Sequence, residues 1–229
     1  MKNILIVGGS SGIGLALAKK MQGSCQLYTA SRTSDTLHEI KGTHLPYNVR
    51  TDTFQTDTFP ALHGLVYCPG SINLRPFKGL KPDTFREDFE LNVMGAIKIL
   101  QSLEKNLKAA QGASVVLFST VAVQTGMPFH ASVASAKGAL EGLTRSLAAE
   151  WAPHIRVNCI APSLVQTPLA DKFLNNEAKL LKASERHPLQ RVGTPEEVAE
   201  LSHFLLNDNS TWMTGQIITL DGGLGTLKT

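Results

Sequence analysis

The sequence predicts an α/β protein whose core is a doubly wound parallel sheet of about seven strands with helices on both faces. Short apolar runs alternate with longer segments of helical periodicity along the whole chain, which is typical of strands joined by crossover helices. The first apolar run ends in a glycine-rich loop, a common connection between first strand and first helix in such folds. Neither a fixed-period repeat nor a low-complexity linker interrupts the 229 residues, so we expect one domain over residues 1–229.

The strands are predicted from short apolar runs, several of them rich in β-branched residues, that end at glycine, proline or polar residues. The first run is the clearest, because Ile4, Ile6 and Val7 are β-branched and two glycines follow. In chain order, the predicted strands cover residues 3–7, 25–30, 43–47, 64–68, 114–118, 155–160 and 216–220.

Helices are predicted where apolar residues recur at spacings of three and four. On this criterion residues 83–108 form one long helix, and a second long helix ends near Trp151. Shorter helices are expected over 12–21 and 196–206. Residues 162–194 are the only long stretch without a clear pattern, which predicts a lid over a site, with a mobile surface excursion as the alternative.

Composition excludes several classes of function. The chain is 42% hydrophobic and 18% charged, and its net charge of +3 is not the concentrated basic surface of a nucleic-acid-binding protein. No apolar stretch approaches the roughly 18 residues of a membrane span, and the apolar run at 4–7 is too short for a signal peptide. Cys25, Cys68 and Cys159 form no metal-type pair, and the histidines show no ligand spacing. We therefore expect a metal-free cytoplasmic protein without a nucleic-acid or membrane partner.

The loop after the first predicted strand has the composition of a nucleotide-binding turn. It consists of Gly8, Gly9, Ser10, Ser11, Gly12, Ile13 and Gly14. Gly8 permits a tight turn, Gly12 lets the backbone approach a pyrophosphate, and Gly14 allows close helix packing. The following helix N-terminus offers free N–H groups to phosphates. This context favours a Rossmann-like dinucleotide site, and an ordinary strand–helix turn is the alternative.

Motifs over nearly the whole chain then resemble the short-chain dehydrogenase/reductase family. The spacing of the loop glycines matches that family's TGxxxGxG pattern, with Val7 in place of Thr. Residues 156–162 (RVNCIAP) resemble its sixth strand, with Ser163 in place of the usual Gly. Residues 191–199 (RVGTPEEVA) and the stretch from 214 to 223 resemble its closing signature.

Cofactor preference is predicted from the end of the second strand. An NAD site of this type places a carboxylate there for the ribose 2′-OH, whereas this chain has Ser31 and Arg32. Ser31 leaves room for a 2′-phosphate and Arg32 can bind one, so NADP(H) is favoured over NAD(H); a solvated surface arginine is the alternative. The resemblance places Asn48 and Val49 beside the adenine. It also implies cofactor contacts from Gly70, Lys137, Pro162 and Thr167.

The resemblance implies a catalytic set in which one position is changed. Asn92 and Lys137 match the family's Asn and Lys, and Thr120 stands at its Ser position. The Tyr position, four residues before Lys137, is Val133. Valine cannot donate a proton, and a positioned general acid contributes about 10²–10⁴ in rate.

Four groups are candidates for the missing proton donor. They are His130, Ser132, Tyr67 and a water held by Lys137 and Asn92. The alternatives are that His130 is a capping or surface residue and that Tyr67 is a core aromatic residue. Lys137 has the alternative of a solvated helix lysine, although its motif is intact.

Two functions remain open on the sequence. The first is an NADP(H)-dependent oxidoreductase that transfers hydride between nicotinamide and a carbonyl or alcohol substrate, with a non-standard proton donor. The second is a catalytically silent NADP(H)-binding protein, a sensor or partner subunit. The resemblance also implies a small-molecule substrate and a homodimer or homotetramer formed through the two long helices, whose apolar stripes alternatively face only the sheet.

Overall fold

Seven strands form one parallel sheet, as the sequence predicts. Their order in the sheet is β3-β2-β1-β4-β5-β6-β7. The computed structural model describes residues 1–57, 59 and 61–228, so Thr58, Pro60 and Thr229 of the predicted domain lie outside the described residues. The strands are β1 (Asn3–Val7), β2 (Gln26–Ser31), β3 (Thr43–Pro46), β4 (Gly64–Tyr67), β5 (Ala113–Phe118), β6 (Ile155–Pro162) and β7 (Ile217–Leu220).

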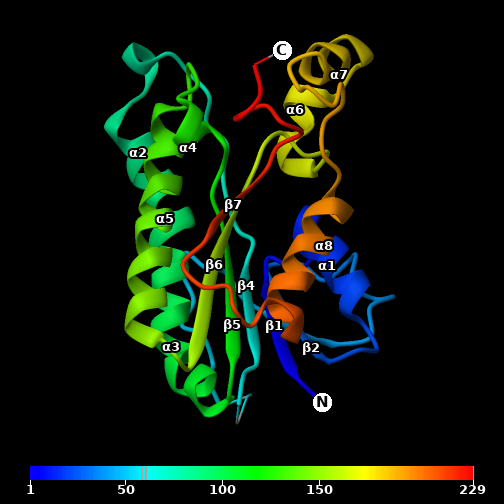
Figure 1. Ribbon diagram of the computed structural model, residues 1–229, viewed down its shortest axis with the longest axis vertical. Helices are drawn as coiled ribbons and strands as arrows, with labels where there is room; N and C mark the ends of the chain where they lie inside the picture. The colour runs from blue at the N-terminus through cyan, green and yellow to red at the C-terminus, as the bar shows by residue number, and fades with distance from the viewer. Residues whose placement is uncertain (58, 60, 229) are drawn as a thin grey trace.

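Helices cover both faces of the sheet, α2, α3 and α5 on one side and α1 and α8 on the other (Figure 1). The α-helices are α1 (Gly12–Met21), α2 (Pro82–Phe89), α3 (Gly95–Ala109), α4 (Ala122–Thr125), α5 (Ala131–Trp151), α6 (Asp171–Leu174), α7 (Glu177–Ser184) and α8 (Pro195–Leu206). A π-helical turn, η2 (Glu90–Met94), and three 3₁₀ turns, η1 (Phe77–Gly79), η3 (Pro168–Ala170) and η4 (Asp208–Ser210), complete them. No helix within the described residues has both the length and the apolar character needed to cross a membrane.

The central strands are buried on both faces, and their side chains divide by alternation. Leu5 and Val7 pack into the core beneath α3 and α5, whereas Ile4 and Ile6 pack into the core beneath α1 and α8. All four side chains are at most 1% exposed. Continuous apolar runs such as β1 are therefore explained by two cores that share one layer of strands.

The prediction of one long helix over 83–108 is wrong in one respect, because a π turn divides that helix into α2 and α3. The N–H of Gly95 donates to the carbonyl of Glu90, five residues back, instead of Leu91. The Leu91 carbonyl accepts the Tyr67 hydroxyl at 2.6 Å instead. The apolar spacing hides this turn, since the extra residue is specified by a side chain on β4.

The segment 162–194 is also more ordered than predicted, since it contains η3, α6 and α7. Asn176 begins α7, and its side chain accepts a hydrogen bond of 2.9 Å from the Lys179 N–H. A bridge between Val165 and Gly193 joins the two ends of the segment. The expectation of an irregular stretch was wrong because these helices are too short to establish a period.

Other boundaries differ from the prediction by one or two residues. The second strand begins at Gln26 and ends at Ser31, and Cys68 lies just after β4. Thr194 and Glu197 form a capping box at the start of α8, which fixes that helix one residue earlier than predicted.

Candidate active site

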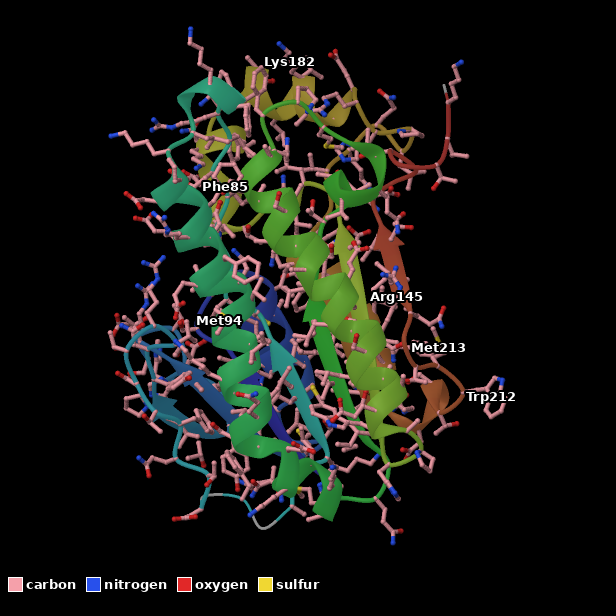
Figure 2. All side chains as sticks on the ribbon, turned by 90° about the vertical axis from the view of Figure 1, so that its left-hand side faces the viewer. Phe85, Met94, Arg145, Lys182, Trp212 and Met213 are labelled. Atoms are coloured by element: carbon pink, nitrogen blue, oxygen red, sulfur yellow. The ribbon has the colours of Figure 1, made fainter. Side chains whose placement is uncertain are left out.

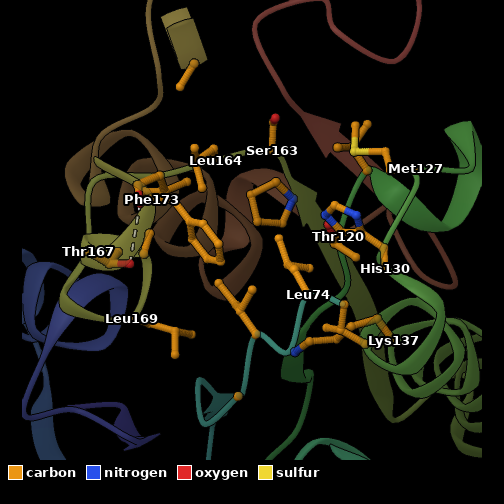
Figure 3. A pocket seen from close by; sticks show the side chains of 18 of the residues that line it. Leu74, Thr120, Met127, His130, Lys137, Ser163, Leu164, Thr167, Leu169 and Phe173 are labelled. Carbon is orange, nitrogen blue, oxygen red and sulfur yellow. Dashed lines mark hydrogen bonds between the residues drawn. The ribbon is translucent and has the colours of Figure 1, made fainter. Parts of the chain in front are cut away.

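A cavity of about 480 Å³ opens where the carboxyl ends of the strands meet the 162–194 segment (Figure 3). In open parallel sheets this edge is where ligands bind. Predicted site residues from distant parts of the chain line it together: Ile13, Gly70, Thr120, His130, Val133, Lys137, Pro162 and Thr167. The topology therefore assembles one site from five separate segments. No group of three His, Cys, Asp or Glu side chains in the described part of the chain is placed to hold a metal ion.

Lys137 is the buried charge of this cavity. It lies in the second turn of α5 and is only 8% exposed. Burial lowers the pKa of its ammonium group to about 8, although Cys159, Cys68 and Asp88 oppose the shift. A lysine with this pKa exchanges protons near neutrality, which makes it suited to acid–base chemistry.

Asn92 lies behind Gly70, and both its amide oxygen and the Lys137 ammonium group are close to that glycine. Its amide nitrogen donates to the Asp88 carbonyl at 2.7 Å and to the Ser71 hydroxyl at 3.0 Å. Its Oδ1 is buried and accepts no hydrogen bond from the described residues. A Cβ added to Gly70 would lie 3.2 Å from Asn92 Oδ1 and 3.4 Å from Lys137 Nζ, so a side chain here would crowd both polar groups.

The four candidate proton donors are separated by the structure. Tyr67 and Ser132 are not among the residues that line the cavity. The Tyr67 hydroxyl donates to the Leu91 carbonyl, and burial raises its pKa far above the usual range. The Ser132 hydroxyl donates to Asp88 Oδ2 at 2.5 Å. His130 and Lys137 do line the cavity, and His130 Nδ1 lies 2.8 Å from the carbonyl of Pro128.

Val133 occupies the cavity wall at 4% exposure, one turn before Lys137. Its side chain presents only methyl groups to the site. The structure thus places an apolar surface where the resemblance implies a phenol.

A buried carboxylate beside the site escaped the sequence-based prediction. Asp88 is fully buried and accepts hydrogen bonds from Ser71 (2.5 Å), Asn73 (2.7 Å) and Ser132 (2.5 Å). These donors satisfy its charge away from water. Only one feature of the sequence indicated its burial: Asp88 directly precedes Phe89, which belongs to the predicted apolar stripe of the helix.

A serine and a histidine that the sequence did not identify also line the cavity. Ser163 Oγ and His187 Nε2 are 2.8 Å apart, and His187 Nδ1 lies 2.8 Å from the Ala183 carbonyl. His187 is 3% exposed. The pair joins the loop that follows β6 to the turn that follows α7. The serine stands where the resemblance implies a glycine.

The glycine loop has the geometry needed for a phosphate cradle. Gly8 and Gly12 adopt left-handed backbone angles, φ +78° and +51°. A Cβ on Gly14 would lie 2.2 Å from the Gly8 carbonyl oxygen. Ser11 precedes α1 without a side-chain capping bond, and the first turn holds no acidic residue. The N–H groups of this turn therefore remain available to an anion, and the loop fits a dinucleotide pyrophosphate.

The end of β2 presents Arg32 to solvent, next to this loop. Arg32 is exposed and takes part in no ion pair within the described residues. Ser31 is buried, and its hydroxyl donates to the Thr33 carbonyl at 2.8 Å and lies 3.0 Å from His44 Nε2. Arg32, rather than Ser31, is thus the side chain free to bind a ligand here.

Three further predicted cofactor positions have contacts within the protein. The Asn48 amide oxygen accepts from the Arg50 N–H at 3.2 Å, and Val49 is buried against Gly95. A Cβ on Gly12 would lie 3.2 Å from a methyl carbon of Thr167. The start of the 162–194 segment therefore packs directly on the glycine loop.

The glycine loop and the cavity at the strand ends define a dinucleotide-binding α/β protein. Residues 49–225 match a family model described as enoyl-(acyl carrier protein) reductase. The chain is 31% identical over 242 residues to a tropinone reductase homolog of Arabidopsis thaliana, covering 97% of this chain and 91% of that protein. It therefore belongs to the short-chain dehydrogenase/reductase family.

Solved structures agree with this assignment. A short chain dehydrogenase family protein from Francisella tularensis superposes with a TM-score of 0.89 at 26% identity, over 99% of this chain and all of that one. The structure of ElxO with NADP bound superposes with a TM-score of 0.89 at 25% identity, over 97% of this chain and 98% of that one.

Proposed function

We propose that this protein is an NADP(H)-dependent oxidoreductase that interconverts a carbonyl and an alcohol, with a proton donor other than tyrosine. The observation that carries the proposal is the convergence of Thr120, Lys137 and the buried Asn92 amide on one cavity beside the glycine loop. The similarity to a tropinone reductase homolog supports the same reaction class.

The cofactor sites are proposed from the residues that fit them. The N–H groups of Gly12, Ile13 and Gly14, with the serines Ser10 and Ser11, would hold the pyrophosphate. Arg32 would bind a 2′-phosphate, which favours NADP(H) over NAD(H). NADP in the similar structure of ElxO supports this choice.

The remaining predicted contacts complete the cofactor site. Asn48 and Val49 would flank the adenine, and Lys137 the nicotinamide ribose. Gly70, Pro162 and Thr167 would face the nicotinamide end, since all three line the cavity.

The cofactor would supply hydride chemistry, and the chain would position the substrate and provide the proton. The Thr120 hydroxyl would orient the substrate oxygen by donating a hydrogen bond to it. Asn92 Oδ1, which has no partner among the described residues, would accept a hydrogen bond from a water that Lys137 also binds.

Two groups remain as the proton source, His130 and the water held by Lys137. We favour the water, because the pKa of Lys137 is lowered to about 8 by burial and its position in the family motif is intact. His130 is tied through Nδ1 to the Pro128 carbonyl, which leaves Nε2 for a role in substrate binding. Val133 would form an apolar contact with the substrate.

We also propose a lid, an oligomeric state and a cellular location for the protein. Residues 162–194 would act as a substrate lid, because Leu169 and Phe173 line the cavity while Val165 holds the base to Gly193. A homodimer or homotetramer would form through α3 and α5. The protein would act in the cytoplasm on a small molecule.

The test is a screen of aldehydes and ketones in which NADPH oxidation is followed by absorbance. Wild-type protein is expected to turn over at least one class, His130→Gln to retain most of that rate, and Lys137→Met to lose about 10²-fold or more. NADPH binding without turnover of any substrate would instead favour a catalytically silent sensor or partner subunit, which Val133 would suit.

A further inference from the structure

The cavity carries an excess of positive charge at its mouth. Among the described residues, no Asp or Glu lines it, whereas four cations of the 162–194 segment do. These are Lys172, Lys179, Lys182 and Arg186, all of them exposed. None belongs to an ion pair within the described part of the chain. Their charges are therefore not neutralised by the protein.

The four cations fall into two kinds. Lys172 Nζ donates to the Ile72 carbonyl at 2.7 Å, and Lys179 Nζ donates to the Lys172 carbonyl at 3.0 Å, so both help to hold the segment in place. Lys182 and Arg186 make no side-chain hydrogen bond to the described residues. Lys182 follows Lys179 by three residues and Arg186 follows Lys182 by four, which places the three cations on one side of α7 and its continuation.

The position of α7 separates these cations from the expected cofactor phosphates. Of the glycine loop, only Ile13 borders the cavity, and Arg32 does not. Figure 1 shows α7 beyond the carboxyl ends of the strands, and Lys182 lies at that end of the molecule in Figure 2. The phosphate cradle is at the start of α1, so the cations of α7 face the space left for the substrate.

Much of the remaining lining of the cavity is apolar. Leu74, Met127 and Val133 line it from the side of α2 and α5, and Leu164 and Phe173 line it from the 162–194 segment. Such a lining binds a hydrocarbon body and leaves polar groups at its two ends. One end is the reacting oxygen near Thr120 and Lys137, and the other is at the cations.

We infer that the substrate is a carbonyl compound with an apolar body and an anionic group, a carboxylate or a phosphate ester, at the end remote from the reacting carbon. Lys182 and Arg186 bind the anion, assisted by Lys172 and Lys179. This inference rests on the proposed function for the position of the reacting carbon, and it adds the charge and polarity of the molecule that binds there.

Three probes of equal chain length test it: hexanoate, hexyl phosphate and the neutral hexanamide. Their affinities for the NADPH-loaded protein are measured by calorimetry at low and high salt. The two anions are expected to bind more tightly than hexanamide, and only their affinities fall as salt screens the cations. The ratio of the two anion affinities distinguishes a carboxylate site from a phosphate site.

Charge-removing variants give the decisive comparison. Lys182→Gln/Arg186→Gln is expected to weaken the anions about five- to tenfold and to leave hexanamide unchanged. Lys19→Gln, which removes an exposed lysine at the end of α1, is the matched control and changes neither. Equal binding of hexanoate and hexanamide, an unchanged affinity in the double variant, or no anion binding at millimolar concentration would each overturn the inference.

The two proposals fail in different ways. A protein that binds no NADPH, or that reduces no carbonyl compound, contradicts the proposed function, whatever the probes show. NADPH-dependent reduction of a neutral ketone with full activity in Lys182→Gln/Arg186→Gln upholds the proposed function and contradicts the anionic substrate.

Discussion

The Tyr67 hydroxyl occupies the space in which residue 95 would carry a Cβ. An ideal Cβ on Gly95 would lie only 2.2 Å from that oxygen, which donates to the Leu91 carbonyl at 2.6 Å. The glycine and the tyrosine thus specify the π turn together. That turn places Asn92 behind Gly70, and so a contact between β4 and a helix sets the geometry of the site.

Gly95→Ala is therefore expected to lower the free energy of unfolding by about 2 kcal/mol, because the methyl group collides with a buried hydroxyl. Urea denaturation measures the loss. The double variant Gly95→Ala/Tyr67→Phe recovers part of it, since the ring carbon is 3.3 Å from the same point and the oxygen is gone. Additive losses from the two substitutions would show that the contact does not specify the turn.

Asp88→Ala is expected to destabilise the protein by about 3 kcal/mol, because Ser71, Asn73 and Ser132 would each lose a buried acceptor. Thermal or urea unfolding reports the change. Asp83→Ala removes an exposed carboxylate on the same helix and is the control, with little effect expected. Comparable stability of the two variants would contradict a structural role for the buried network.

Substitution of Val133 tests whether the absence of a tyrosine hydroxyl limits the rate of carbonyl reduction. Val133→Tyr is expected to raise carbonyl reduction about 10- to 100-fold, because it restores a hydroxyl one turn before Lys137. Val133→Phe is the matched control, since it adds the ring without the hydroxyl and gives no such gain. An unchanged rate in Val133→Tyr, with a substrate that the wild type reduces, would show that another donor has fully replaced the tyrosine.

The proton source predicts a pH dependence. Because burial lowers the pKa of Lys137 to about 8, its protonated form is lost as the pH rises through that value. The value of kcat/KM for reduction should therefore fall above about pH 8, and that for alcohol oxidation should rise. Lys137→Arg remains protonated throughout and should lack this transition. A wild-type profile that is flat across pH 8 would contradict the role of Lys137.

Arg32→Ala tests the preference for NADP(H). We expect it to weaken NADPH binding about tenfold and NADH binding less than about twofold, because only NADPH carries the 2′-phosphate. Fluorescence titrations with both cofactors measure this, with Lys41→Ala, which truncates an exposed lysine before β3, as the control. Equal losses for the two cofactors would remove the assignment of Arg32 to the phosphate.

Much of the fold could be predicted because its signals are local. The β-branched run of β1, the glycines after it and the Thr194 cap of α8 each act within a few residues. The positions of Thr120, Lys137 and Gly70 could be assigned to one site only through the resemblance to the family. The structure brings the three together because they follow strands or lie near the start of a helix at the same edge of the sheet.

The remaining features depend on contacts between distant segments. The local sequence does not reveal the π turn at residues 90–94, because Gly95 favours it only in combination with the distant Tyr67, whose hydroxyl donates to the Leu91 carbonyl. The Ser163–His187 pair joins residues 24 apart. In the sequence, the cations of α7 are indistinguishable from those of an ordinary solvated helix face, and only the fold shows that they line the cavity.

The most direct test of the central claim is a titration of the purified protein with NADPH and with NADH, followed by nicotinamide fluorescence. It requires no knowledge of the substrate. The account predicts micromolar binding of NADPH and much weaker binding of NADH. Binding of neither cofactor would contradict it, because the glycine loop would then have no dinucleotide to hold.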